Sequence, residues 1–324
     1  MNRHIAAKVI ELIVTLVTIT FLSFMLVYLA PSDAAEKMLN GNGFIASQET
    51  IDAMRSRLGL DQDVFTQYIS WISGVIQGNL GTSFRTGRPV VSQLAPALLR
   101  TLELAALAFS ITVAVSIPTG IQCAKRKNGT FDRIIRYCTY FFASLPSFFL
   151  GIVVLYVLAG RLGVIPASMA TSSNPLTLFV PACVLAFSLS AWMIRQVRTA
   201  VLEKLDDGFV TGLRMRGIPE HVIFRSYVLK ASMAPIITAL GICLGSLMGG
   251  AVLVENVFSW PGLGQVVLTA INYLDYPVIQ GFAIWIALIY FAINILIDVF
   301  CALADPRIRM GGGVGGSSSN MVEK

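Results

Sequence analysis

The sequence has few of the side chains on which enzymes depend. Its 324 residues include only two histidines, His4 and His221, and charged residues make up 13% of the chain. No Walker-type G-x-x-x-x-G-K-[ST], HExxH or GxSxG motif is present, and the carboxylates do not cluster. The chain therefore has no recognisable means of holding ATP phosphates by itself, and a membrane-embedded enzyme would lack its catalytic groups.

Cysteine usage excludes a second group of functions. The five cysteines have no CxxC spacing, and all of them fall in or beside apolar stretches: Cys123, Cys138, Cys183, Cys243 and Cys301. This pattern predicts neither a disulfide framework nor a zinc site. We expect the chain to bind no metal and no cofactor of its own.

Long apolar runs are what the sequence has in abundance, with 55% hydrophobic residues overall. Each run reaches the ~20 residues that a helix needs to cross a ~30 Å hydrocarbon layer. Inside lipid, a backbone must satisfy its own hydrogen bonds, which favours helices. The sequence therefore predicts an all-α integral membrane protein with six transmembrane helices, at residues 9–30, 101–124, 134–160, 176–197, 231–254 and 278–302.

Basic residues sort the loops between these runs into two sides. Residues 125–136 and 195–230 are rich in Lys and Arg, whereas 161–175 contain only Arg161 and 255–277 contain neither. Because basic loops stay in the cytoplasm, we expect both termini to be cytoplasmic and the long loop at 31–99 to lie outside.

Helical spacing within the outer loop predicts two short helices, at 51–58 and 64–76. The first apolar run is interpreted as a retained signal anchor. Residues 1–309 are expected to form one transmembrane domain, and 310–324 to form a flexible tail because of their Gly and Ser content.

Carboxylates within the predicted spans are scarce: Glu11, Glu103 and Asp298. Carriers driven by an ion gradient generally need such groups near the middle of the membrane. Energy is therefore expected to enter through the cytoplasmic stretch 195–230, which reads as two helical pieces, 202–216 and 220–229, around Gly217. On residues alone, this stretch is equally an amphipathic interfacial helix without a partner.

Several motifs point to a known family. They occur in order along the chain at 58–62 (LGLDQ), 101–105 (TLELA), 144–148 (SLPSF), 255–264 (ENVFSWPGLG), 275–281 (DYPVIQG) and 305–309 (DPRIR). Together with the cytoplasmic segment 208–235, they make the chain resemble the peptide/nickel branch of the permeases of ABC importers. The resemblance implies the type I importer permease fold and a bacterial cytoplasmic membrane location.

The same resemblance implies partners. These would be a second homologous permease, two ATP-binding subunits that hold the ATP, and an extracytoplasmic solute-binding protein. In the family, the cytoplasmic segment docks in a cleft of the ATP-binding subunit. The positions that correspond here, and are expected to couple to the ATPase, are Phe209, Arg214, Gly217, Val222, Tyr227 and Pro235.

A second set of positions is expected along the translocation pathway and its outer gate: Glu255, Asn256, Trp260, Gly245 and Gly249. Two alternatives stay open for them. The glycines, spaced four apart, serve either internal helix packing or a pore at a subunit seam. Glu255 either attracts a cationic cargo, or has a structural role in which it caps a helix or contacts the partner permease.

The resemblance leaves two classes of cargo open. The Glu255–Asn256 pair resembles nickel-type members, and we expect nickel, as an ion or a chelate, with di- and oligopeptides as the alternative. No histidine lies in the predicted spans, so a stepwise chain of metal ligands is not visible. A carrier or channel acting alone is the competing class, but neither broken inverted repeats nor rings of ionisable groups support it.

Overall fold

The computed structural model describes residues 2–28, 34–40, 47–166, 168–169 and 176–304. Within this part the regular secondary structure is helical, apart from one isolated antiparallel bridge between Thr82 and Pro89. Its helices are α1 Asn2–Tyr28, α2 Ala34–Asn40, α3 Gln48–Leu58, α4 Val64–Ile76, α5 Val90–Lys125, α6 Thr130–Ala143, α7 Ser147–Leu155 with the π-helical η1 Tyr156–Arg161, α8 Leu176–Leu205, α9 Gly208–Met215, α10 Glu220–Val222, the π-helical η2 Ile223–Val228, α11 Leu229–Val257, α12 Leu263–Tyr273 and α13 Tyr276–Ala304. The predicted tail at 310–324 lies outside the described residues.

Four helices in the described part of the chain are long and apolar enough to cross a membrane. They are α5, α8, α13 and the continuous rod Glu220–Val257, which joins α10, η2 and α11. The bent pair formed by α6 and α7–η1 makes a fifth candidate if it counts as one span. In α1, the apolar stretch Ile10–Met25 is shorter than the 18 residues of a spanning window. The all-α class is thus confirmed, and the predicted six spans are supported for four or five.

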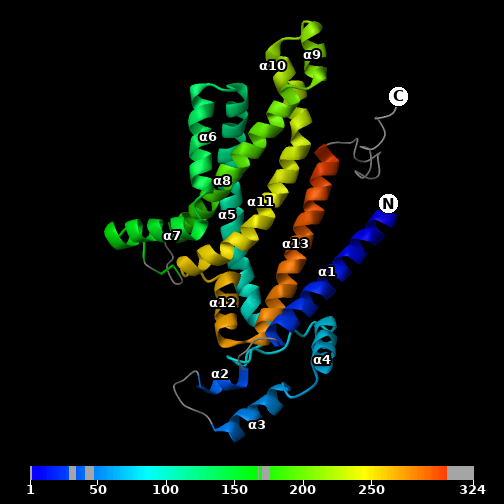
Figure 1. Ribbon diagram of the computed structural model, residues 1–324, viewed down its shortest axis with the longest axis vertical. Helices are drawn as coiled ribbons and strands as arrows, with labels where there is room; N and C mark the ends of the chain where they lie inside the picture. The colour runs from blue at the N-terminus through cyan, green and yellow to red at the C-terminus, as the bar shows by residue number, and fades with distance from the viewer. Residues whose placement is uncertain (1, 29–33, 41–46, 167, 170–175, 305–324) are drawn as a thin grey trace, which may run out of the picture.

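The predicted span at 134–160 is broken into two pieces, α6 and α7–η1. The axis turns by 91° between α6 and α7. Pro146 occupies the N-cap of α7 with an extended backbone, and its missing N–H and its ring prevent α6 from continuing. As a result α7 leaves the bundle sideways (Figure 1). Gly151 of α7 lies against Phe258, whose ring is 3.3 Å from where a Cβ would be.

The two ends of the bundle carry different structures. Helices α2, α3 and α4 lie at one end, whereas α9 and α10 project from the opposite end (Figure 1). The predicted helices of the outer segment are confirmed as α3 and α4. Ser47 caps the start of α3, and Gly59, with φ of 69°, ends it.

The segment before α5 is shorter than the predicted outer loop at 31–99, because α5 begins at Val90. Pro89 sets the first turn of this helix, and its apolar side is then buried against α12 and α13. The residues that form this packing are Val90, Leu94, Ala97, Leu263, Ala270 and Val278. This burial accompanies an extension of the helix by eleven residues, 90–100, before the predicted apolar run at 101–124.

Close approach of α5 and α8 holds the centre of the bundle together. At Gly120 a Cβ would lie 2.7 Å from the Cβ of Val197, so only glycine allows the two backbones to pack this closely. The adjoining apolar core includes Ala108 on α5, Leu185 on α8 and Leu247 on α11. This core fixes the positions of the helix ends where the candidate sites lie.

Candidate functional site at the coupling end and the outer joint

The projecting end is a helical hairpin built around Gly217. Asp207 caps α9 by accepting a hydrogen bond from the Phe209 N–H, so the predicted helical piece at 202–216 is broken between α8 and α9. Gly217 follows α9 with φ of 71°, a left-handed conformation that glycine adopts without strain. Pro219 then starts α10. The turn therefore rests on residues whose backbone preferences match it.

Buried apolar side chains attach this hairpin to the bundle. Val210 of α9 packs with Ile223, Phe224 and Val228, and all four lie in one core with Val197 and other residues of α8. In the predicted helical piece 220–229, Phe224 is therefore buried, whereas Tyr227, which was expected to couple to the ATPase, is 42% exposed. The π-helical turn of η2 shifts which positions face the bundle.

The outer surface of the hairpin is mixed in character. Arg214 and Glu220 pair across the Gly217 turn, with Nε of the arginine 2.6 Å from the carboxylate. Phe209 is 38% exposed and Met215 is 83% exposed, so two large apolar side chains face outward at the tip. Sequence reasoning missed Met215, although its position between Arg214 and Arg216, next to the glycine turn, was the available signal.

Val222 and Pro235 are the remaining residues that were expected to couple to the ATPase. Val222 is half-buried at the end of α10. Pro235 lies inside α11, seven positions into the helix, and not on the hairpin. The structure thus places Phe209, Arg214 and Gly217 in the projecting hairpin and leaves Pro235 apart from it.

At the other end of α11, Glu255 is fully buried. Its carboxyl group accepts a 2.6 Å hydrogen bond from the Thr101 hydroxyl and another 2.6 Å bond from the Gly264 N–H. The same Thr101 hydroxyl accepts from the Leu263 N–H at 2.8 Å. One carboxyl group therefore joins α5, α11 and the start of α12.

Two glycines make room for this joint. A Cβ at Gly262 would collide with the Glu255 carboxyl carbon, and one at Gly264 would lie 2.8 Å from a carboxyl oxygen. Trp260 is buried beside them and donates its indole N–H to the Arg100 carbonyl at 3.1 Å. This geometry fits the helix-capping alternative for Glu255. A carboxylate that attracts cargo would need solvent access, which Glu255 lacks.

The glycine series on α11 divides between two environments. A Cβ at Gly241 would collide with Ile297, and one at Gly245 would lie 3.0 Å from the Tyr290 ring, so both glycines serve packing against α13. Gly249 has no atom within 4 Å of its Cβ position. It lies on an exposed face of α11, at helical spacing, together with Ile242, Ser246, Leu253 and Asn256.

Metal-binding potential is low in the described part of the chain. No group of three or more His, Cys, Asp or Glu side chains there is arranged to hold a metal ion.

Comparisons with known proteins identify the family. Residues 116–310 match the model of the binding-protein-dependent transport system inner membrane component, and residues 1–105 match the corresponding N-terminal region of such membrane components. The chain belongs to this permease family. The permease is therefore a multi-pass inner-membrane component of an ABC transporter, and it is not itself an enzyme. Such a component works with an ATPase and a binding protein.

Curated relatives match the permease over nearly its whole length. A probable D,D-dipeptide transport system permease, DdpB of Escherichia coli K12, is 34% identical over 93% of this chain and 96% of that protein. A nickel import system permease, NikB of Staphylococcus aureus MRSA252, is also 34% identical, over 95% of this chain and 92% of that protein. The two cargo classes thus have relatives of equal identity.

Among solved structures, the MetNI methionine ABC transporter in an inward-facing conformation has a similar chain. The TM-score is 0.55 at 18% identity, over 66% of this permease and 97% of that chain. At this identity the match shows the fold alone, and it supports the permease architecture for the helical bundle.

Proposed function

We propose that this permease is one of two homologous transmembrane subunits of an ABC importer, energised by two ATP-binding subunits at its α9–α10 end. The observation that carries the coupling assignment is the hairpin that projects from the bundle with Phe209 and Met215 exposed (Figure 1). Soluble monomeric proteins rarely expose adjoining large apolar side chains to water. A docking surface, in contrast, uses such side chains as anchors.

The orientation follows from the same arrangement. The basic segment 195–230 carries the hairpin, and helices α2–α4 lie at the opposite end of the bundle. The positive-inside rule places the hairpin in the cytoplasm, both termini on that side, and α2–α4 toward the solute-binding protein. We also propose that α1 and the bent α6–α7 pair each count as a span, giving six.

The exposed face of α11 is the proposed contribution to the translocation pathway. Gly249 and Asn256 lie on it, whereas Glu255 and Trp260 are turned into the protein. A helix face that is exposed in one subunit would form the wall of a passage when a second homologous subunit lies opposite it. Gly245 is left out of this lining because it packs against Tyr290.

Nickel, as an ion or a chelate, is the proposed cargo, supported by the relatives named as nickel import permeases and by the Glu255–Asn256 pair. A D,D-dipeptide is the second candidate, supported by a relative of the same identity. Because the described residues offer no cluster of metal ligands, selectivity for either cargo would reside mainly in the binding protein.

The test of cargo is a deletion of the gene in its source bacterium, complemented by the intact gene. Loss of radiolabelled nickel accumulation, with dipeptide uptake unchanged, is the expected result. The reverse pattern would assign the permease to dipeptides. Loss of neither would contradict both cargoes.

The test of coupling is site-directed crosslinking in the assembled transporter. A cysteine at Met215 should crosslink to an ATP-binding subunit, whereas a cysteine at Gln48 of α3 should not. Crosslinking from Gln48 alone would reverse the assignment of the two ends.

A further inference from the structure

A pocket between α6 and α8 contains more positive charge than its one acidic side chain balances. It has a volume of about 270 Å³ and is lined by Arg136, Arg195 and Arg198 but by only one carboxylate, Asp132. The volume lies below the ~300–1,000 Å³ of typical small-molecule pockets, so the space suits a small charged group rather than a whole organic cargo.

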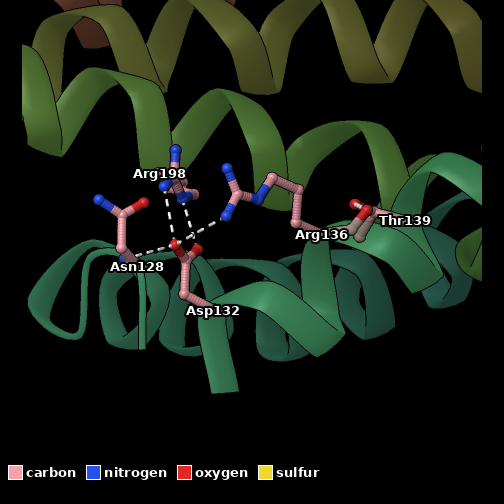
Figure 2. A network of polar contacts seen from close by, with 5 residues as sticks. All are labelled: Asn128, Asp132, Arg136, Thr139 and Arg198. Atoms are coloured by element: carbon pink, nitrogen blue, oxygen red, sulfur yellow. Dashed lines mark hydrogen bonds and ion pairs between the residues drawn. The ribbon is translucent and has the colours of Figure 1, made fainter. Parts of the chain in front are cut away.

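Asp132 is already fully used. It is completely buried, and Arg198 binds both of its oxygens, with Nε at 2.6 Å and Nη2 at 2.8 Å. The Asn128 N–H donates a further 3.0 Å bond to it. Figure 2 shows these groups converging on the carboxylate from α8 and from the turn before α6. This pair accounts for one arginine and the one acid.

The other two arginines have spare donors. Arg136 approaches Asp132 only to 3.8 Å, which is beyond hydrogen-bond distance, and it points toward α8 in Figure 2. Arg195 donates one bond to the Thr139 carbonyl at 3.2 Å and lies over the Tyr140 ring at 5.4 Å. A guanidinium carries five N–H donors and stays charged at every relevant pH.

The pocket lies where membrane headgroups would lie. Asp132 and Arg136 fall in the first two turns of α6, and Arg198 follows directly after the apolar run 176–197 of α8. Beside the pocket, α6 presents the exposed side chains Tyr137 (68%), Tyr140 (57%) and Phe141 (63%). An apolar and aromatic surface next to a pocket in which three arginines share one carboxylate matches a lipid, with its phosphate inward and its chains along α6.

We propose that this α6–α8 pocket is a binding site for the phosphate group of an anionic phospholipid, held by Arg136 and Arg195. The Asp132–Arg198 pair is the fixed wall of the site and sets the positions of the two helices. The proposal requires only that the chain lies in a membrane, so it does not depend on the cargo. Its chemistry is charge-assisted hydrogen bonding between guanidinium and phosphate.

The experiment compares phospholipids on the purified full-length permease. Delipidated protein in detergent is titrated with phosphatidylglycerol or with phosphatidylcholine, and bound lipid is counted by native mass spectrometry. Phosphatidylglycerol should bind more tightly than phosphatidylcholine. The double variant Arg136→Gln, Arg195→Gln should lose roughly tenfold or more of this affinity, since each removed contact to a charged group is worth about one such factor.

The control is Arg133→Gln, which removes one positive charge from the exposed side of α6, outside the pocket. It should bind phosphatidylglycerol like the wild type. Equal binding by all three proteins, or an equal loss in the control, would overturn the proposal. A third arm measures the binding of inorganic phosphate without lipid. The assignment to a lipid would be overturned if phosphate binding depends on Arg136 and Arg195 and its affinity equals or exceeds that of phosphatidylglycerol. Melting temperatures of the variants identify any that misfold. If the double variant misfolds, the single variant Arg136→Lys is compared with the wild type in its place.

Discussion

The hydroxyl of Thr101 donates a 2.6 Å hydrogen bond to the carboxyl group of Glu255, and neither side chain has appreciable contact with solvent. This contact joins α5 to α11 at the start of α12. Gly262 and Gly264 close over the same carboxyl group from the start of α12. The motif at 255–264 thus describes a structural joint, and its glycines and its acid are parts of one arrangement.

Replacing Glu255 with Gln should weaken this joint. An amide can accept only through one oxygen, so one donor among Thr101 and Gly264 loses its partner, at a cost of about 1–3 kcal/mol. Thermal unfolding in detergent should show a lowered melting temperature. Any transport defect should be the same at low and high ionic strength.

The control is Glu103→Gln, which removes the exposed ion pair with Arg100 and should change stability by less than ~1 kcal/mol. A transport defect of Glu255→Gln that shrinks as salt is added would restore the interpretation that the charge attracts cargo.

Substitutions at Gly217 should separate backbone strain from steric obstruction. No atom lies within 4 Å of its Cβ position, so a larger side chain has room, but φ of 71° is costly for most residues. Gly217→Asn should keep most transport, because Asn tolerates this conformation, whereas Gly217→Val should reduce it, with a strain of about 1–2 kcal/mol. ATP-driven uptake at equal expression is the measurement. Equal loss in both variants would show that the docking surface itself requires glycine.

Removing Asp132 should be strongly destabilising. Asp132→Ala leaves Arg198, with only 19% of its side chain exposed, without its bidentate partner, and breaking such a pair costs about 3–5 kcal/mol. The matched variant Asp206→Ala breaks an exposed pair with Lys127 and should cost at most ~1 kcal/mol. Thermal unfolding of the two proteins in the same detergent decides the point. Similar melting temperatures would mean that the α6–α8 pair contributes little.

Topology can be checked with a membrane-impermeant thiol reagent on single-cysteine variants. Gln48 and Asn272 should be labelled from outside, and Asn128 and Glu220 only after permeabilisation; all four positions are exposed. The starting protein has all five native cysteines replaced by Ser, which is needed above all at the exposed Cys138 and the partly exposed Cys183 and Cys301. Labelling of Glu220 in intact cells would invert the orientation and the coupling assignment with it.

Much of the secondary structure followed from the sequence alone. The bounds of α4 and the end of α3 at Gly59 were predictable, because amphipathic spacing and capping residues act over a few neighbouring positions. The Gly217 turn was predictable for the same reason. Length and hydropathy likewise indicated the membrane class, since the bilayer imposes the same demand on every spanning helix.

Only the tertiary structure decided which side chains are buried and which helices continue. The 91° bend at Pro146 falls within a run that is apolar enough overall to pass for one span, so hydropathy alone could not give the angle between its two halves. Glu255 and Asn256 are adjacent, yet one is buried and the other exposed, because one helical step of 100° turns a side chain from a neighbour to open space. Asp132 meets Arg198 across 66 residues, and no local pattern encodes that distance. Local physics fixed the helices of this permease, and packing between distant segments selected the roles of its charged residues.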